Sequence, residues 1–420
     1  MTIRHAIAAV RTYGLRGIYD FMKRMPRCRK MRRMFEDSLV RDSSWRPRPG
    51  ITIIGNMSSA GSLSKVLRDF VERLKTCHIP HQAFDTNDGD RIPASEYAHL
   101  LTPDADFRLN RFTDIVGMTA LPALPKTDCR LSHILFWEFE DGISTHDPNF
   151  ILPMEIIAMA DPLVTTFRRF VAKSIPVSKI LYPFTFKPGR LISASDIRAK
   201  YGIAADDFVV FYNFSYASCY CRKNPEGAVR AFAEALGGCA DVKFVFKTMC
   251  ARDNNGYAAR LHSLVASLGL SDRVIFIDNY LLQDELVSLT NACDVYLSLH
   301  RGEGFGLGIA EAMSLGKPVV ITNYCAPTEY CTEGNSMLVP YTFVSVKPEE
   351  RDAGDHRISF YENVRHWPEP DVHAAAKALR RLYDDRAFAK QLGENARRFI
   401  ADYFSDANFT KSVEAFLARG

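Results

Sequence analysis

The feature that most constrains this chain is a regular alternation of apolar, strand-like runs and helical segments in its second half. The strand-like runs are Phe208–Tyr212, Val242–Phe246, Val274–Ile277, Val295–Leu299 and Val319–Ile321. Helical patterns separate them, at about 225–237, 257–268, 284–293 and 307–315. Apolar strands that alternate with helices are typical of a parallel sheet covered on both faces. Right-handed crossovers make such a region a doubly wound α/β domain, which binds ligands at the carboxyl ends of its strands.

The first half shows the same α/β pattern less clearly. The run 51–54 is β-rich, the loop 55–61 is rich in Gly and Ser, and an amphipathic helix follows, with an apolar face of Leu63, Val66, Leu67, Phe70, Val71 and Leu74. The runs 134–137 and 163–167 read as further buried strands. A strand, a loop and a helix in this order predict the opening of a Rossmann-like domain.

The length of 420 residues favours two domains. Pro176, Pro183 and Pro188 cluster, and we place the boundary there. We therefore expect a basic helical segment, an N-terminal Rossmann-like domain, a C-terminal Rossmann-like domain and a terminal amphipathic helix. Their expected bounds are 1–48, 49–185, 186–400 and 401–420.

The positive charge of the chain is concentrated at its N-terminus. Residues 1–48 hold 13 Lys and Arg against four Asp and Glu, a net charge of +9, whereas the whole chain has +4. A basic amphipathic helix fits an anionic membrane surface or an acidic partner, and it equally fits a solvated helix packed on the protein. Nucleic acid is disfavoured because the segment has few aromatic side chains for stacking.

The location of the protein follows from what the sequence lacks. It has no apolar run of about 18 residues, no secretory signal, and ten scattered cysteines without a CxxC pair. We expect a cytoplasmic protein with free thiols. If residues 1–48 touch a membrane, the protein would be held at its inner face.

The most informative segment is Ser298–Met313, which follows a strand and opens a helix. Its glycines at 304, 306 and 308 let the backbone approach a ligand closely. The helix N-terminus offers free N–H groups to a phosphate or a sugar hydroxyl. Glu311 falls in the expected first helical turn, where its charge is favoured and where it can accept hydrogen bonds from two ribose hydroxyls. Glu303, on the loop, can reach a more distant hydroxyl.

A glycine-rich turn of this kind is compatible with two different roles as well. Dinucleotide binding would give an oxidoreductase, but the glycines fall late in the chain, and two flanking glutamates would repel a pyrophosphate. A purely structural glycine turn is the second alternative.

A resemblance to a known family favours sugar transfer. The segment from Glu303 to Glu311, with its seven intervening residues, followed by 312–320, resembles the E-x7-E segment of the group 1 (family 4) glycosyltransferases. The stretches 322–330 and 334–340 resemble the same family. The match extends over about 205–405 and is loose in the first half. Members are retaining enzymes of the GT-B fold, with two Rossmann-like domains and a nucleotide-sugar donor bound by the C-terminal one.

The resemblance implies roles for particular residues. Glu311 would hold the ribose, and Glu303 with the backbone of Gly304, Phe305, Gly306 and Leu307 would hold the donor sugar. Arg222 and Lys223 would bind the diphosphate, although many relatives have a Gly-Arg directly after the preceding strand. Asn224 and Pro225 also read as the N-cap and first residue of the next helix, which would place Lys223 beside a helix N-terminus. Gly61 and Ser62 would approach the phosphates from the N-terminal loop.

Other residues are weaker candidates. Trp137, Glu138 and His300 are candidate contacts of the acceptor or the sugar, although Trp137 and His300 equally fit structural roles. The segment 341–370 is an insertion with no role evident in the sequence.

The resemblance also implies a mechanism. The leaving diphosphate would be stabilised by Arg222 and Lys223, and its departing phosphate would take the proton of the acceptor. Glu303 would position the donor and would not be a nucleophile. No metal-ligand pattern stands out, so we expect neither a metal nor a cofactor. The acceptor would be a glycan, or a lipid-linked glycan of polysaccharide biosynthesis if residues 1–48 touch a membrane. A non-catalytic protein that binds sugar nucleotides or glycans as a scaffold remains an alternative.

Overall fold

The chain forms two compact units in a computed structural model. The structure describes residues 48–419 apart from 59–61, 86–91, 103–108, 116–129, 144–154, 172, 253–254, 351–360 and 362. The first unit contains the described residues up to Trp137, Ile143–Thr185 and Phe404–Gly420. The second contains Glu138–Gly142 and Phe186–Tyr403. The expected helical segment 1–48 lies outside the described residues except for Arg48, which begins the first strand.

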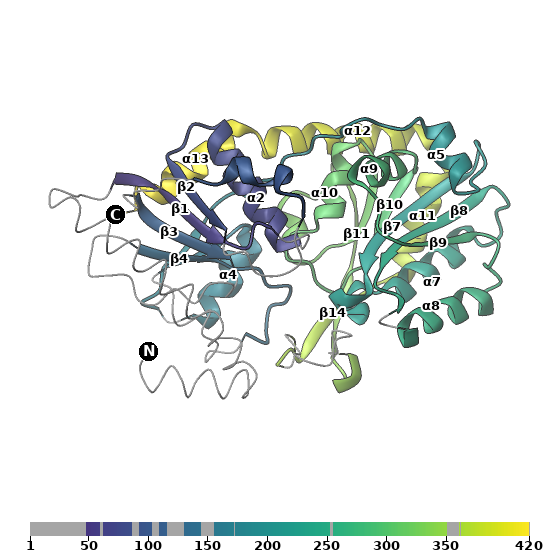
Figure 1. The fold of residues 1–420 in the computed structure, drawn as a ribbon. Helices are drawn as coiled ribbons and strands as arrows, with labels where there is room; N and C mark the ends of the chain where they lie inside the picture. Colours follow the sequence, from purple (N-terminus) through teal and green to yellow (C-terminus); the bar gives the residue numbers. More distant parts are fainter. Residues whose placement is uncertain are drawn as a thin grey trace. The chain divides into compact units, whose positions relative to one another are not determined.

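A six-stranded parallel sheet forms the centre of the first unit (Figure 1). Its strand order is β2-β1-β3-β4-β5-β6. The strands are β1 (Arg48–Gly55), β2 (His81–Asp85), β3 (Leu109–Ile115), β4 (Arg130–Ile134), β5 (Glu155–Ala158) and β6 (Val177–Lys179). Helix α2 (Ser62–Thr76) packs on β1 and β2 through the expected apolar face, in which Leu67, Phe70 and Leu74 are fully buried.

One predicted strand of this unit is wrong. The run 163–167 lies in the helix α4 (Asp161–Phe170), which packs on β5 and β6. Proline in the first turn suits a helix start. Leu163, Val164 and Phe167 are buried at helical spacing, so packing of this face outweighs the β propensity of the run.

The second unit is a doubly wound domain with a six-stranded parallel sheet. Its strand order is β12-β11-β10-β7-β8-β9. The strands are β7 (Phe208–Ser215), β8 (Val242–Met249), β9 (Val274–Asp278), β10 (Val295–Ser298), β11 (Val319–Thr322) and β12 (Met337–Val339). The expected strands all occur, and they are largely apolar because both faces of the sheet are covered.

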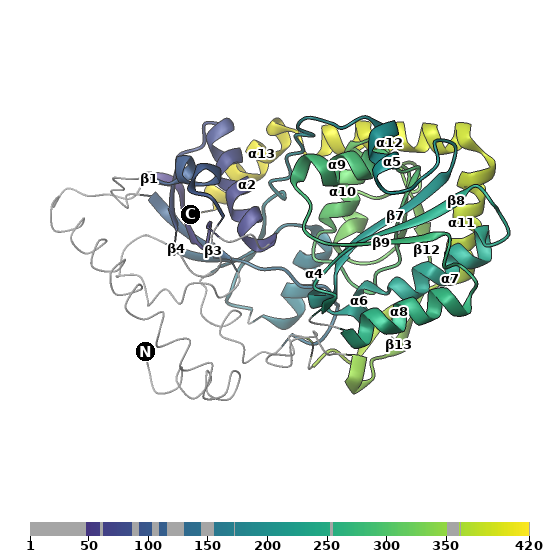
Figure 2. The same cartoon turned by 45° about the vertical axis from the view of Figure 1, so that its right-hand side comes forward.

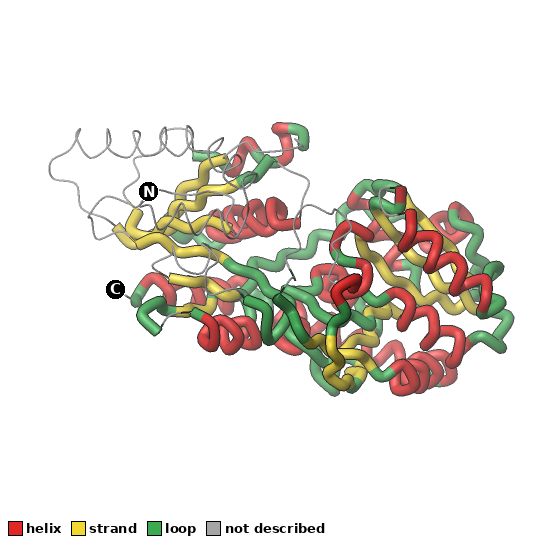
Figure 3. The backbone as a smooth tube through the Cα atoms, turned by 90° about the horizontal axis from the view of Figure 1, so that it is seen from below, coloured by secondary structure: helices red, strands yellow, loops and turns green. Residues whose placement is uncertain are grey.

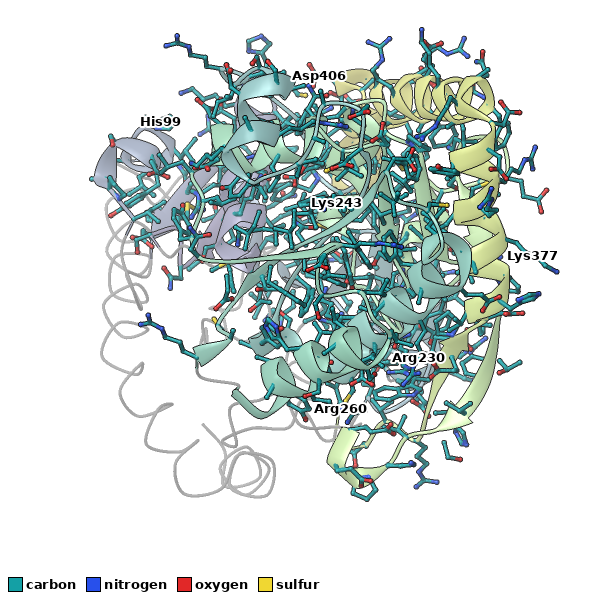
Figure 4. The ribbon with its side chains drawn as sticks, turned by 90° about the vertical axis from the view of Figure 1, so that its right-hand side faces the viewer. His99, Arg230, Lys243, Arg260, Lys377 and Asp406 are labelled. Atoms are coloured by element: carbon teal, nitrogen blue, oxygen red, sulfur yellow. The ribbon has the colours of Figure 1, made fainter. Side chains whose placement is uncertain are left out.

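Two helical layers cover this sheet, as Figure 3 shows by the red helices on either side of the yellow strands. One layer contains α7 (Pro225–Leu236), α8 (Asn255–Ser267) and α11 (Val372–Asp384). The other contains α5 (Ala194–Lys200), α9 (Gln283–Asn291), α10 (Leu307–Ser314) and α12 (Arg386–Tyr403). Figure 4 labels Arg230 on α7 and Arg260 on α8, and Arg260 forms an ion pair with Glu226 in the first turn of α7.

The insertion 341–370 contains an antiparallel hairpin of β13 (Tyr341–Ser345) and β14 (His366–Pro370), separate from the main sheet. Trp367 of β14 is 2% exposed and packs in the second unit. The insertion is therefore an integral part of this unit's core.

Helix α13 (Asp406–Leu417) belongs to the first unit and packs against α2 and β6. Figure 2 shows α13 beside α2. Two buried arginines of the first unit hold it. Arg73 donates to the carbonyls of Phe184 and Phe404 and pairs with Asp406, which Figure 4 labels. Arg111 donates to the carbonyl of Arg419 and pairs with Glu155. No helix among the described residues is long and apolar enough to cross a membrane.

Candidate functional site

The strand order of the second unit places a topological switch point between β7 and β10, where doubly wound sheets hold ligands in a crevice at the carboxyl ends of their strands. β7 comes first in the unit, and the chain proceeds from it to β8 and β9 on one side and to β10, β11 and β12 on the other. At such a switch point the connections after the two central strands diverge and leave room for a ligand. Arg222 and Lys223 follow β7, and Glu303 follows β10.

Backbone and side-chain hydrogen bonds join these two connections. The N–H of Arg301 donates to the carbonyl of Arg222 (2.8 Å). The amide of Asn224 donates to the carbonyl of Leu299 (3.0 Å). Asn224 is also the N-cap of α7, as expected, since its side-chain oxygen accepts the N–H of Gly227. These hydrogen bonds hold the connection after β7 against the connection after β10.

Lys223 and Glu303 form an ion pair in this crevice. The Lys223 ammonium contacts Oε1 of Glu303, and the side chains are 15% and 13% exposed. Burial opposes the charge of Glu303, but attraction to Lys223 and Arg222 is stronger and lowers its pKa to about 2. Burial lowers the pKa of Lys223, while the charge of Glu303 acts in the opposite direction. Glu303 is therefore a fixed carboxylate at neutral pH.

Arg222 contributes differently from Lys223. Its guanidinium donates to the carbonyls of Gly302 (2.6 Å) and Ser218 (3.0 Å), and it lies 3.8 Å from Glu303. It is 5% exposed and lies over the ring of Tyr361. Arg222 therefore supports the loop that carries Glu303 and adds positive potential, while Lys223 is the more exposed of the two cations.

His300 is fully buried next to this cluster. Neither ring nitrogen has a hydrogen-bond partner among the described residues. Burial lowers its pKa to about 4, with the charges of Lys223 and Arg222 acting in the same direction. His300 is neutral at pH 7, and a buried polar group of this kind usually pairs with water or a ligand.

The N-terminus of α10 forms another side of the site. Gly306 is its N-cap with φ +83°, a backbone conformation that favours glycine. The hydroxyl of Tyr330 donates to the carbonyls of Phe305 (2.6 Å) and Gly306 (3.0 Å), which fixes the turn. A Cβ at Gly308 would lie 2.5 Å from the hydroxyl of Tyr296, so α10 sits directly on the sheet. The helix therefore presents its positive end at the crevice.

The position predicted for Glu311 within the helix is wrong. α10 begins at Leu307, so Glu311 lies in its second turn, and the first turn contains no acidic residue. The helix start itself was predicted correctly, but one turn of 3.6 residues from Leu307 ends before Glu311. The charge of Glu311 interacts with Tyr296 on the neighbouring strand, so the residue still lies at this end of the sheet.

The remaining candidates fall in different units. Glu138 belongs to the second unit, with Arg222, Lys223 and Glu303, whereas Trp137 belongs to the first. Ser62 begins α2 in the first unit, and Gly61 lies outside the described residues.

Some residues that shape the site were not found from the sequence. Tyr330 lies in a stretch that resembles the family, but nothing marked its hydroxyl as a support for the glycine turn. Arg301, next to the motif, forms a two-pronged ion pair with Glu369 and lies over Trp367, both from the insertion. The sequence does not reveal these contacts of the insertion, because the residues that form them are distant along the chain.

The sequence of the second unit is similar to those of known proteins. The family model described as glycosyl transferases group 1 matches residues 194–399. The D-inositol 3-phosphate glycosyltransferase of Acidothermus cellulolyticus is 30% identical over 158 residues, 37% of this chain and 34% of that protein. The chain thus matches about a third of that relative's length.

Solved structures share the overall fold. Sucrose-phosphate synthase from Thermosynechococcus elongatus is similar over 88% of this chain and 98% of its own, with a TM-score of 0.61 and 18% identity. HepE from Anabaena, solved with UDP and glucose, is similar over 88% of this chain and 100% of its own, with a TM-score of 0.59 and 17% identity. At such identities the likeness concerns the fold. Through residues 194–399 the chain belongs to the group 1 glycosyltransferases, and its two parallel sheets give it their two-domain GT-B fold.

Proposed function

We propose that this protein is a retaining, metal-independent glycosyltransferase that moves a sugar from a nucleotide-sugar donor to a glycan or lipid-linked glycan. The observation that carries the proposal is the buried Lys223–Glu303 pair at the switch point, beside the N-terminus of α10. A cation, a carboxylate and a helix N-terminus together match the diphosphate and the hydroxyls of a nucleotide-sugar.

Donor binding would exchange the partners of this pair. The diphosphate takes the place of Glu303 beside Lys223, with the N–H groups at the start of α10 on its other side. Glu303 then accepts hydrogen bonds from sugar hydroxyls, and Glu311 accepts them from the ribose. A ligand with both an anion and hydroxyl groups leaves neither buried charge without a partner.

The same residues serve the chemical step. Cleavage of the sugar–phosphate bond places negative charge on the leaving diphosphate, which Lys223 and the helix N-terminus stabilise. These fixed positive groups do what a divalent cation does elsewhere, so the reaction proceeds without metal. Glu303 positions the donor as an ionised hydrogen-bond acceptor. The acceptor attacks from the face that the diphosphate leaves, and the departing phosphate takes its proton.

The donor class and the location are further parts of the proposal. UDP-sugars are the first donors to test, because HepE was solved in complex with UDP and glucose. The basic segment 1–48 favours work at the inner face of the membrane, on a lipid-linked acceptor.

The test measures the thermal stability of the purified protein with UDP-, GDP- and dTDP-sugars, and with NAD and NADP. A ligand of the native state raises stability by RT ln(1 + [L]/Kd), so a donor at a hundredfold excess over Kd adds about 2.7 kcal/mol. We expect a shift with one class of nucleotide-sugar, its loss in Glu311→Ala, and its retention in Glu333→Ala, which removes an exposed carboxylate of the same unit.

Turnover completes this test. We expect transfer in the presence of EDTA and an anomeric configuration in the product that equals that of the donor, as read by NMR. A shift with NAD alone contradicts the proposal. Binding of nucleotide-sugars without any turnover favours a scaffold.

A further inference from the structure

A short segment from the first half of the sequence forms part of the second unit. Residues 138–142, which we call the strap, leave the first unit after Trp137 and return to it at Ile143. Its contacts in the second unit include Gly302, Val364 and Trp367, which come 160 or more positions later in the sequence. Such a detour has to be held by specific contacts.

The insertion supplies these contacts. Phe139 is 1% exposed and its ring packs edge-on against Tyr361 (5.1 Å between centroids) and beside Trp367 (6.5 Å). The N–H of Arg365 donates to the carboxylate of Asp141 (3.2 Å). Gly142 has φ +81°, and a Cβ there would lie 2.5 Å from a methyl group of Val364. The insertion thus contacts the strap at Phe139, Asp141 and Gly142, and we call these contacts the clamp.

The clamp places Glu138 directly beside the motif. A Cβ at Gly302 would lie 2.6 Å from the carbonyl oxygen of Glu138 and 3.1 Å from its Cβ. Gly302 precedes Glu303, and the carbonyl of Gly302 accepts a hydrogen bond from the guanidinium of Arg222. The strap therefore contacts Gly302, the residue that precedes Glu303 and binds Arg222 through its carbonyl.

The carboxylate of Glu138 acts on both cations of the site. It helps to raise the pKa of Arg222 and favours the charged form of Lys223. It is half-buried, and it forms no ion pair with any described residue. Arg222 and Lys223 therefore face two carboxylates, those of Glu303 and Glu138, before a ligand enters.

These two carboxylates act differently on two ligands. A free nucleoside diphosphate lacks the sugar, and Glu138 repels its diphosphate, which also draws Lys223 away from Glu303. A nucleotide-sugar brings the same diphosphate together with the hydroxyl groups of its sugar, which donate hydrogen bonds to carboxylates. Two carboxylates near the basic pair thus favour the substrate over the product that must leave.

We propose that Glu138, held on the strap by the insertion, is a specificity-determining residue that weakens binding of the free nucleoside diphosphate relative to the nucleotide-sugar donor. The inference rests on the proposed function, because it assumes that the basic pair binds a diphosphate. It gives the insertion a role, namely to hold one carboxylate beside the diphosphate site.

The experiment measures, by titration calorimetry on the full chain, the Kd of UDP, GDP and dTDP and of the corresponding sugar nucleotides. Glu138→Gln removes one charge and keeps the shape of the side chain. We expect it to tighten the nucleoside diphosphate by about tenfold and to leave the donor equal or weaker. The control Glu333→Gln makes the same change at an exposed site and leaves the ratio of the two Kd values as in the wild type.

A second variant tests the clamp. Phe139→Ala removes the anchor of the strap and is expected to shift the ratio in the same direction as Glu138→Gln. Combined with Phe139→Ala, the Glu138→Gln change is expected to add little, since the two act through one position of one carboxylate. Circular dichroism and the thermal midpoint show whether each variant is folded.

The outcomes are distinguishable. A ratio in Glu138→Gln that equals that of Glu333→Gln, or a weaker nucleoside diphosphate, overturns the role of Glu138 while the wild type still binds its donor. Full additivity of Phe139→Ala and Glu138→Gln overturns the clamp. A wild type that binds none of these nucleotides overturns the proposed function and this inference with it.

Discussion

Replacing Glu303 by Gln removes the charge that Lys223 and Arg222 hold in the crevice. The pKa of Glu303 is lowered from 4.5 to about 2. Each pKa unit corresponds to about 1.4 kcal/mol, so ionised Glu303 contributes about 3 kcal/mol to the free energy of unfolding at pH 7. Its side chain is 13% exposed, so solvent screens little of this contribution. We expect Glu303→Gln to lower the free energy of unfolding at pH 7 by about 3 kcal/mol.

The contribution of Glu303 to the free energy of unfolding depends on pH in a direction set by its lowered pKa. Because the folded-state pKa lies below the unfolded value, the contribution is complete above about pH 4.5 and is lost as the pH falls toward 2. The difference between wild type and Glu303→Gln is therefore expected to stay constant from pH 7 to about pH 5 and to shrink below it. Protonated Glu303 then resembles Gln, and the two proteins converge.

The site favours the charged form of Glu303 but not that of Lys223. Burial lowers the pKa of Lys223, so its charge is costly in this place even beside Glu303. Removing both charges, in Lys223→Met with Glu303→Gln, is expected to cost much less than Glu303→Gln alone, because no buried charge is then left without a partner.

The assay is urea unfolding followed by Trp367 fluorescence, which reports on the second unit once Trp45 and Trp137 are replaced by Phe. Glu333→Gln is the matched control and is expected to fall within about 0.5 kcal/mol of the wild type. A loss below about 1 kcal/mol in Glu303→Gln, or a loss that grows as the pH falls, would refute the reasoning.

Three further predictions concern other parts of the molecule. Gly306→Ala places a side chain at φ +83° and 2.9 Å from the hydroxyl of Tyr330, and is expected to cost about 1–3 kcal/mol and to weaken donor binding; calorimetry measures both. Arg111→Met leaves Glu155 buried without its ion-pair partner and is expected to cost about 3–5 kcal/mol in urea unfolding, much of which Glu155→Gln restores. Since the pKa of His300 is about 4, its ring signals in NMR are expected to stay constant from pH 8 to pH 5.5, and a midpoint near 6.5 would contradict its neutral, buried state.

Much of the second unit could be predicted from its sequence. Its strands are continuous apolar runs and its helices have clear starts, such as Asn224 followed by Pro225, so local patterns were sufficient. The proximity of Glu303 and Lys223 is understandable from the sequence, because a motif and a basic pair follow two strands and the carboxyl ends of parallel strands meet at one edge. In the first unit the run 163–167 was misread because β-branched residues also fill the buried face of a helix.

The rest depends on contacts that local patterns cannot reveal. The strap is held by Tyr361, Val364 and Trp367, more than 200 residues away in the sequence. The same is true of α13, which is amphipathic in any fold and whose partner, the first unit, no periodicity identifies. Long-range packing of short segments is specified by shape and by single hydrogen bonds, and these leave no repeat in the sequence.

The return of the chain's end to the first unit has a consequence for synthesis on the ribosome. The second unit is almost continuous in sequence, so most of it can fold while the chain is still growing. The first unit cannot be completed until its last helix has been translated, because Arg73 and Arg111 need the carbonyls of Phe404 and Arg419. Until then, among the described residues, Arg73 has only the carbonyl of Phe184 and Arg111 only the carboxylate of Glu155, and each lacks its C-terminal acceptor. Translation that stops before residue 404 is therefore expected to yield a folded second unit beside a first unit that proteases degrade.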